Sequence, residues 1–342
     1  MKKCLFLLCA LLILALLQAL LIPKYMETSP EGALTGEYYV NSGGNDVIFI
    51  GDCEVYENFS PVTLWQKYGI PSYIRGSAQQ MIWQSYYLLE ETFRYETPKV
   101  IVFNVLSMKY DIPESTGSPT RREAYNRMTL DTMRWSSSKW KAIEASLTEE
   151  EREWEGIFTY LFPILRYHDR WNQLTAEDLA YWFRRDTVSH NGYLMQTGVK
   201  PVSGDYTSAP LADYHFGENS WNYLEKIRVL CAEKGAQLVL IKAPTLYPVW
   251  WGEWDEQISR YAEEKGLLYL NMLEHVEEIG IDWDTDTYDA GLHLNVWGAE
   301  KASAWLGEIL QKECALPDRR EDGKLSAKWE EKTAAYEAEK CP

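Results

Sequence analysis

The sequence predicts an α/β fold in which a parallel sheet carries helices on both faces. Short, continuously apolar segments recur along the chain, as expected for strands that are buried on both faces. Amphipathic segments of helical length separate most of them, and the links between the segments are short. This alternation of strand and helix is the pattern that builds parallel sheets.

The first part of the domain supplies three strands with helices between them. We predict strands over residues 46–50, 72–74 and 99–105, the last in the segment KVIVFNV. Ser60 as an N-cap and Gly69 as a C-terminal stop delimit a helix over PVTLWQKY. A second helix, over AQQMIWQSYYLLEETFRY, connects the second strand to the third.

The alternation stops between residues 110 and about 210, where helical segments follow one another without a clear strand. We therefore predict a helical insertion there, and expect it to form a wall or lid over the functional site. The alternation then resumes with a helix over NSWNYLEKIRVLCAEKG, a strand AQLVLIK, a helix EWDEQISRYAEEKG, a strand LLYLNM and a helix that begins near Asn295. The charged segment 315–342 is predicted to be helical, and either packs on the insertion or lies free in solvent.

The N-terminal segment, residues 1–23, is predicted to anchor the chain in a membrane. A helix over Leu5–Ile22 would be roughly 27 Å long, close to the hydrocarbon thickness of a bilayer. We expect an uncleaved anchor, although LQALL keeps a cleaved signal open as an alternative. Lys2 and Lys3 precede the segment, which predicts a cytoplasmic N-terminus and an extracytoplasmic domain. A polar connector, residues 24–45, leads to the α/β domain, residues 46–314.

Composition excludes several classes of function. The net charge of -17 argues against binding to nucleic acid and to anionic lipid, because both ligands are bound by clustered Lys and Arg side chains. The cysteines show no CxxC spacing, and no two histidines lie at ligand spacing with a carboxylate or thiol nearby, so we expect no metal site. The 15 tryptophans and 23 tyrosines suit sugar stacking, but core packing explains them better.

Chemistry-bearing residues gather at one predicted edge of the sheet. Ligands of open parallel sheets bind beyond the carboxyl ends of the strands. Cys53 follows the first strand, Gly76 follows the second, and Asn104 lies near the end of the third. His293 directly precedes the helix that Asn295 caps, where the positive end of the helix dipole disfavours imidazolium and keeps a base neutral.

A carboxylate to orient this histidine is also close in sequence, because Asp286 and Asp289 both precede it. A nucleophile, an imidazole and a carboxylate from separate loops of one edge make the general triad arrangement. Cys53, His293 and one of the two aspartates are therefore the candidate catalytic set.

Two segments resemble blocks of the SGNH (GDSL) hydrolases. IFIGDC is similar to their first block, where the family usually has the sequence Gly-Asp-Ser. DAGLHLN with GAEKASAWL is similar to their last block, which carries the Asp and the His. The resemblance covers roughly residues 46–312. It implies a flavodoxin-like, three-layer α/β/α sandwich with a five-stranded parallel sheet. It also implies removal or transfer of ester-linked acyl groups, often on cell-wall or exported polysaccharides, without a metal or other cofactor.

Carried over residue by residue, the resemblance implies Cys53 in the nucleophile's place, His293 as the base and Asp289 as the orienting acid. The backbone N–H groups of Cys53 and Gly76 would stabilise the oxyanion. Asn104 is a further candidate oxyanion donor, and Asp52 of the Gly-Asp pair is a candidate for substrate binding.

The chain departs from the family pattern at three places. Cys replaces Ser as the nucleophile; a thiolate attacks well, but Cys is also nearly isosteric with Ser, so an inactive site is the rival explanation. The spacing Asp-x-x-x-His is one residue longer than the usual Asp-x-x-His, so either the loop absorbs one residue or Asp286 serves instead. The Gly-x-Asn-Asp block is absent after the third strand, which leaves the register of Asn104 open.

Two hypotheses follow. The first is a membrane-anchored bacterial esterase or acyltransferase that uses Cys53 and His293 on ester-linked acyl groups of surface glycans. The second is a non-catalytic module of the same fold that binds surface polymers or membrane partners. Among other candidates, we interpret Glu54 as an exposed residue at a loop start, with a site acid as the alternative. We interpret His190 as a surface-loop residue, with substrate binding as the alternative, and WSSSKW as a helix cap or loop.

Overall fold

Five parallel strands form one sheet in the order β2-β1-β3-β4-β5, which is the strand order of flavodoxin-like folds. The computed structural model describes residues 2–23, 31–181, 183 and 189–341. The strands are β1 Val47–Gly51, β2 Ser72–Gly76, β3 Val100–Asn104, β4 Gln237–Lys242 and β5 Leu268–Asn271. The predicted α/β class with a parallel sheet is confirmed.

Alternate side chains of the central strands enter two separate hydrophobic cores. On β1, Ile48 and Ile50 belong to one core, and Val47 and Phe49 belong to the other. Because side chains alternate along a strand, a slip of one residue would move each set to the wrong core. The two cores therefore fix the register of the sheet.

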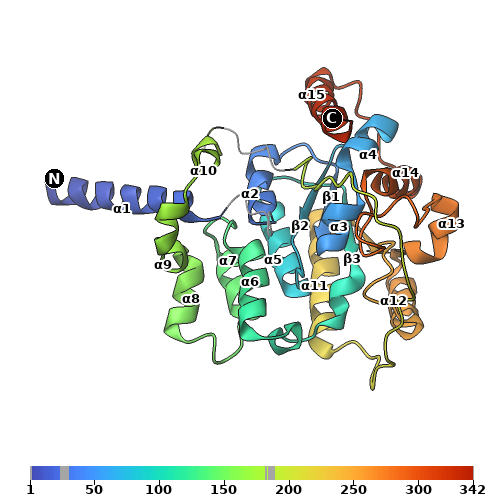
Figure 1. Cartoon of the computed structure of the whole chain (residues 1–342), viewed down its shortest axis with the longest axis horizontal. Coiled ribbons are helices and arrows are strands. Elements are labelled where there is room, and N and C mark those ends of the chain that lie inside the picture. Colours follow the sequence, from blue (N-terminus) through green and yellow to red (C-terminus); the bar gives the residue numbers. More distant parts are fainter. Residues whose placement is uncertain (1, 24–30, 182, 184–188, 342) are drawn as a thin grey trace.

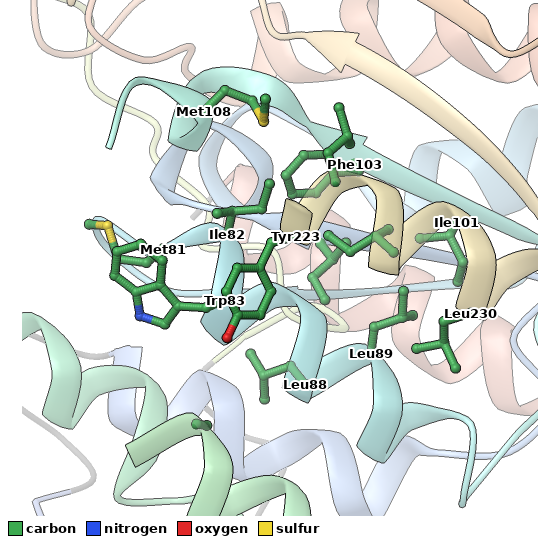
Figure 2. Close-up of a cluster of buried hydrophobic side chains, with 14 of the residues drawn as sticks. Met81, Ile82, Trp83, Leu88, Leu89, Ile101, Phe103, Met108, Tyr223 and Leu230 are labelled. Carbon is green, nitrogen blue, oxygen red and sulfur yellow. The ribbon is translucent and has the colours of Figure 1, made fainter. Parts of the chain in front are cut away.

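Helices cover both faces of the sheet, as Figure 1 shows. The first core is covered by α5 Ile82–Thr92, α11 Glu218–Lys234 and α12 Gly252–Lys265. Figure 2 shows this core, where Ile101 and Phe103 of β3 meet side chains of α5 and α11. The second core is covered by α3 Cys53–Asn58, α4 Pro61–Tyr68 and α14 Val296–Glu313, with η4 Met272–His275 and α13 Val276–Ile279 at its end. Burying each large apolar side chain contributes roughly 1.5–3 kcal/mol.

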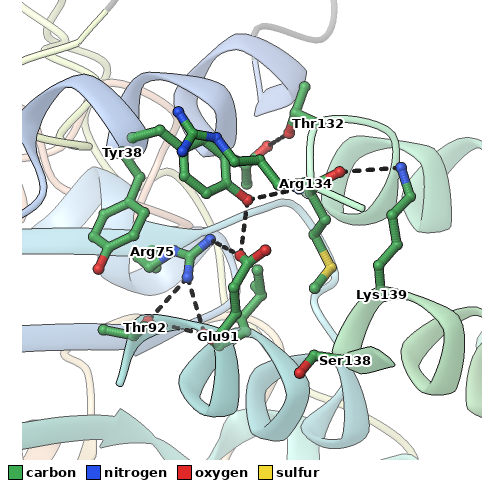
Figure 3. Close-up of polar contacts among 12 residues, drawn as sticks. Tyr38, Arg75, Glu91, Thr92, Thr132, Arg134, Ser138 and Lys139 are labelled. Carbon is green, nitrogen blue, oxygen red and sulfur yellow. Dashed lines mark hydrogen bonds and ion pairs between the residues drawn. The ribbon is translucent and has the colours of Figure 1, made fainter. Parts of the chain in front are cut away.

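The connector predicted over residues 24–45 contains a helix, α2 Glu31–Asn41. Tyr38 of this helix is buried, and its ring centroid lies 4.0 Å from the Arg75 guanidinium carbon on β2 (Figure 3). Arg75 is itself buried and pairs with Glu91 of α5 at 2.9 Å. The helix was missed because glycines interrupt it, although Leu34 and Tyr38 share one face at i, i+4 spacing. Residues 24–30 of the connector lie outside the described residues.

The predicted insertion is helical in its first two-thirds. After η1 Val105–Lys109 come η2 Pro113–Thr116, α6 Pro119–Leu130, α7 Ser137–Ser146, α8 Trp154–Leu161, α9 Ile164–Tyr167, η3 His168–Gln173 and α10 Ala176–Ala180. These helices pack on α2 and α5 and on one another. Within the described part of the insertion, residues 191–210 form an irregular segment.

The irregular segment is the part of the insertion that contacts the loop before α14. Lys200 N–H donates to the Thr287 carbonyl at 2.9 Å, and the Tyr206 hydroxyl donates to the Ala290 carbonyl. The segment therefore runs beside the loop that carries Asp289 and His293. The helices of the insertion do not supply these contacts.

The charged C-terminal segment forms α15 Gly323–Lys340, which packs on α4. The Trp329 ring stacks on Trp65 with centroids 5.3 Å apart, and Tyr336 is fully buried. The predicted helix is confirmed, and it packs both on α4 and on residues 190–193 of the predicted insertion, where Glu339 pairs with His190 and Lys332 donates to Asn191. The contact with α4 was not predicted, because two apolar side chains seven residues apart are inconspicuous among so many charges.

The N-terminal helix, α1 Lys2–Leu21, has a mean hydropathy of 2.9 and is almost entirely exposed. It is long and apolar enough to cross a membrane, a property shared by membrane anchors and signal sequences. Figure 1 shows that it projects away from the α/β domain.

Candidate active site

The candidate nucleophile lies where β1 leaves the sheet. Asp52 caps α3 by accepting a hydrogen bond from the Glu54 N–H at 3.2 Å, and Cys53 is the first residue of that helix. Gly76 ends β2 in register with Gly51. A Cβ atom on Gly76 would lie 2.7 Å from a methyl of Val55, so only glycine allows β2 to approach the turn at Cys53 this closely. Gly76 is thus adjacent to the candidate nucleophile, as the sequence predicted.

The Cys53 thiol lies close enough to the imidazole of His293 for the two groups to interact directly. Cys53 is a partly exposed residue at the carboxyl edge of the sheet. The loop before α14 brings His293 to this position, and Asn295 caps that helix by accepting from the Gly298 N–H at 3.3 Å. The two residues that the sequence proposed as a pair therefore meet.

Asp289 holds the opposite side of the imidazole. Its Oδ2 lies 2.7 Å from Nδ1 of His293, and its Oδ1 accepts the His293 backbone N–H at 2.8 Å. The extra residue in the Asp-x-x-x-His spacing is absorbed because Ala290 and Gly291 both have positive φ, at 68° and 95°. With Nδ1 engaged by the carboxylate, Nε2 is the nitrogen left to face the thiol.

Asp286, the alternative orienting acid, has other partners. Its Oδ2 accepts the Asp282 N–H at 2.8 Å and the Lys301 ammonium at 2.6 Å. The side chain is buried, and these bonds fix the turn that precedes the Asp289 loop. Asp289, and not Asp286, is therefore the aspartate in contact with His293.

Glu57 is a second carboxylate at the same imidazole, and sequence reasoning missed it. Its Oε2 lies 3.1 Å from Nδ1 of His293 and accepts the hydroxyl proton of Tyr288. Cys53 and Glu57 are four residues apart on α3, a spacing that places both side chains on one face of a helix. That spacing was the signal available in the sequence.

These side chains also form a cluster with metal-ligand chemistry. Ligand atoms of Glu57, Asp289 and His293 lie within 4.8 Å of one another. The distances of 2.7 and 3.1 Å from Nδ1 to the carboxylate oxygens are hydrogen-bond lengths. The arrangement is thus explained by a shared proton, and the expectation of no metal site stays a prediction.

For both Cys53 and His293, burial and the neighbouring charges shift the pKa in opposite directions. Burial raises the pKa of the Cys53 thiol to about 11, although the neighbouring His293 partly offsets this. Burial disfavours the imidazolium of His293, but Cys53, Asp289 and Glu57 outweigh that penalty and raise the pKa of His293 well above 6.5. The contribution of Cys53 acts only when its sulfur is a thiolate, so the two ionised groups stabilise each other while burial opposes both charges.

A buried polar layer lies directly beneath Cys53. The Lys242 ammonium, at the end of β4, pairs with the Glu54 carboxylate at 2.9 Å, and both side chains are almost fully buried. The Thr245 hydroxyl and the Asn104 amide also donate to Glu54. The interpretation of Glu54 as an exposed loop residue was wrong. A lysine at the end of an apolar strand needs a buried counter-charge, and this was the missed signal.

Asn104 and Asp52 belong to this layer as well. The Asn104 Nδ2 donates to Asp52 at 3.1 Å and to Glu54 at 2.8 Å, and its Oδ1 accepts the Ala243 N–H. Both amide hydrogens of Asn104 thus have protein partners, so in this structure the side chain supports the nucleophile turn and has no hydrogen left for an oxyanion. Burial and the adjacent Glu54 raise the pKa of Asp52 to about 6, and Asp52 acts as the helix cap described above.

The remaining candidates lie elsewhere. His190 is on a loop as expected, but its side chain is mostly covered by α15, where it pairs with Glu339 at 2.8 Å. In WSSSKW, Ser136 caps α7 by accepting from the Lys139 N–H at 3.1 Å, which confirms the interpretation as a helix cap.

No protein family matches this chain, and no curated protein matches it significantly.

Proposed function

We propose that this protein is an extracytoplasmic esterase or acyltransferase of the SGNH type, with Cys53 as its nucleophile. The observation that carries the proposal is the contact chain Cys53–His293–Asp289 at the carboxyl edge of a flavodoxin-like sheet. Parallel sheets bind their ligands at this edge. The three groups stand in the order that nucleophilic acyl transfer requires.

In the first half-reaction, Nε2 of His293 takes the thiol proton as the sulfur attacks the ester carbonyl carbon. The backbone N–H groups of Cys53 and Gly76 stabilise the oxyanion that forms. The ester C–O bond then breaks, His293 gives its proton to the departing alcohol oxygen, and the acyl group remains on sulfur as a thioester. Asp289 keeps the imidazole in the tautomer that this transfer needs.

In the second half-reaction, a water molecule or an acceptor hydroxyl gives its proton to His293 and attacks the thioester carbonyl. The C–S bond breaks, the sulfur recovers the proton, and an acid or a new ester leaves. Water as the acceptor makes the protein an esterase, whereas a sugar hydroxyl makes it an acyltransferase. We propose ester-linked acyl groups of cell-surface glycans as the substrate class, because α1 as an anchor would hold the domain at the outer surface of the membrane.

One observation favours the alternative of a non-catalytic binding module. Burial raises the pKa of the Cys53 thiol to about 11, which leaves little thiolate near neutral pH. A module of this kind would bind wall fragments saturably without releasing acid from acylated sugars.

The two functions are distinguished with the full chain in detergent micelles, p-nitrophenyl acetate and a panel of acetylated sugars. We expect Cys53→Ala to abolish turnover and Cys231→Ala to retain it, because Cys231 is a buried thiol of α11 that does not touch the site. Equal activity of the two variants would reject Cys53 as the nucleophile. Saturable binding of wall fragments with no turnover by the unmodified protein would establish the module instead.

A further inference from the structure

The helical insertion exposes large apolar side chains close together in sequence. Four of them define what we call the apolar patch, and their exposed fractions are 54% for Leu165, 70% for Trp171, 56% for Leu179 and 89% for Phe183. They come from α9, η3, α10 and the residues just after α10. Large apolar side chains do not stabilise a surface that faces water, and contiguous apolar patches mark interaction sites.

The patch adjoins the end of the apolar helix α1. Both α9 and η3 lie against α1, as Figure 1 shows for α9. The Arg170 guanidinium donates to the Leu21 carbonyl at 3.1 Å and pairs with Asp178 of α10 at 3.0 Å. One arginine thus connects the last turn of α1 to the two elements that carry Trp171 and Leu179.

A cavity lies at the same junction and is lined from both sides. Its volume is about 230 Å³, and Ile22 and Pro23 line it together with Met128 of α6 and Tyr167 of α9. The residues that follow α1 therefore lie beside the insertion. The side chains of the patch are held beside the point where α1 reaches the domain.

We propose that the helical insertion docks on the outer surface of the bilayer, with the apolar patch in the boundary between head groups and acyl chains. The proposal rests on α1 acting as the membrane anchor in the proposed function. A spanning α1 with a cytoplasmic N-terminus brings Leu21 to the outer interface, and the patch then lies at that same depth. Trp is enriched at this interface, and apolar faces of helices bind there by burying area.

The charges around the patch favour zwitterionic lipid. Arg166 pairs with Glu123 at 3.2 Å, and Arg170 forms an ion pair with Asp178. The net charge of -17 would in addition repel an anionic surface. Docking therefore depends on apolar burial and does not require acidic head groups.

Docking would also fix the direction of the proposed active site. Figure 1 shows α3 and α14, which flank Cys53 and His293, farther from α1 than α9 is. A domain held both by α1 and by the patch would present this edge away from the bilayer. That direction suits an acyl group on a wall polymer better than one within the lipid.

The test places a photoreactive p-benzoylphenylalanine in the full chain, reconstituted in phosphatidylcholine nanodiscs. Replacement of Trp171 and, separately, of Leu165 is expected to give lipid adducts on irradiation, detected by mass spectrometry. Leu12 of α1 is the positive control, and Val229, which is 38% exposed on α11, is the matched negative control. The patch positions are well exposed, so the substitutions do not disturb a core.

Adducts at 171 and 165 with none at 229 would establish docking. Adducts at 12 with none at 171 and 165 would overturn docking while leaving the anchor intact. Absence of adducts at 12 would overturn the anchor and with it the docking, whatever the activity of Cys53. Adducts between two copies of the chain at 171, in place of lipid adducts, would overturn docking and show that the patch is a self-association surface.

Discussion

Oε2 of Glu57 lies 3.1 Å from Nδ1 of His293, the same nitrogen that Asp289 contacts at 2.7 Å. One imidazole thus faces two carboxylates, and Tyr288 donates its hydroxyl proton to Glu57. Asp289 also accepts the backbone N–H of His293, so it orients the ring. Glu57 faces the same nitrogen with its carboxylate, and we assign it the role of a positioning residue that stabilises the positive charge on the imidazole.

Glu57→Gln should lower the pKa of His293, because it removes one of the negative charges that raise it. The base form of His293 appears as the pH rises through its pKa. The acid limb of the kcat/KM profile should therefore move to lower pH, by roughly one pH unit. The measurement is the pH profile of p-nitrophenyl acetate hydrolysis.

Asp289→Asn is the matched control, and it should lower the rate at all pH values, by about 100-fold or more, because the wrong tautomer is favoured. An unchanged acid limb in Glu57→Gln would show that Glu57 has no electrostatic effect on the base.

Alkylation of Cys53 by iodoacetamide should accelerate with rising pH well beyond the range of an ordinary cysteine. The reason is that burial raises the pKa of the thiol to about 11, so little thiolate is present near neutrality. The measurement is the rate of adduct formation at Cys53 by peptide mass spectrometry between pH 6 and 11. A rate that is already constant below pH 7 would instead indicate a preformed thiolate–imidazolium pair.

The sheet and the meeting of Cys53, His293 and Asp289 could be predicted from the sequence, since apolar strands and helix caps are local signals and parallel strands bring their carboxyl ends to one edge. The sequence did not reveal Glu57 or the Glu54–Lys242 pair. Each of these depends on which residues of distant elements meet, and single charged residues look alike in sequence. The same applies to α15, where Trp329 contacts Trp65 from the far end of the chain.

The role of Asn104 could not be predicted for a different reason. Its place at the end of β3 was correctly predicted, but the direction of its amide was not. The buried carboxylates of Asp52 and Glu54 attract both amide hydrogens, and neither contact can be read from local pattern.

Arg75→Met should destabilise the fold by about 3–5 kcal/mol, because it leaves the buried Glu91 charge without its partner. The double variant Arg75→Met/Glu91→Leu should recover much of that loss, since no unpaired charge remains. Urea denaturation of the full chain in detergent measures both. Additive losses in the double variant would show that the ion pair is not the source of the effect.

Chelation should leave esterase activity unchanged. The distances around Nδ1 of His293 are explained by hydrogen bonds to Asp289 and Glu57, so catalysis needs no ion there. Activity is measured before and after dialysis against EDTA, followed by readdition of Zn²⁺. Loss of activity on dialysis, restored by Zn²⁺, would make Glu57, Asp289 and His293 a catalytic metal site instead.

The most direct measurement of the central claim is the intact mass of the protein, quenched in acid after brief exposure to p-nitrophenyl acetate. The account predicts one acetyl group per chain, located on Cys53 by peptide mapping, at a rate that falls by about 100-fold or more in His293→Ala. Cys53→Ser should carry the group as an oxygen ester, and Cys53→Ala should carry none. An acetyl group that appears at the same rate in His293→Ala, or that resides on another residue, would contradict the account.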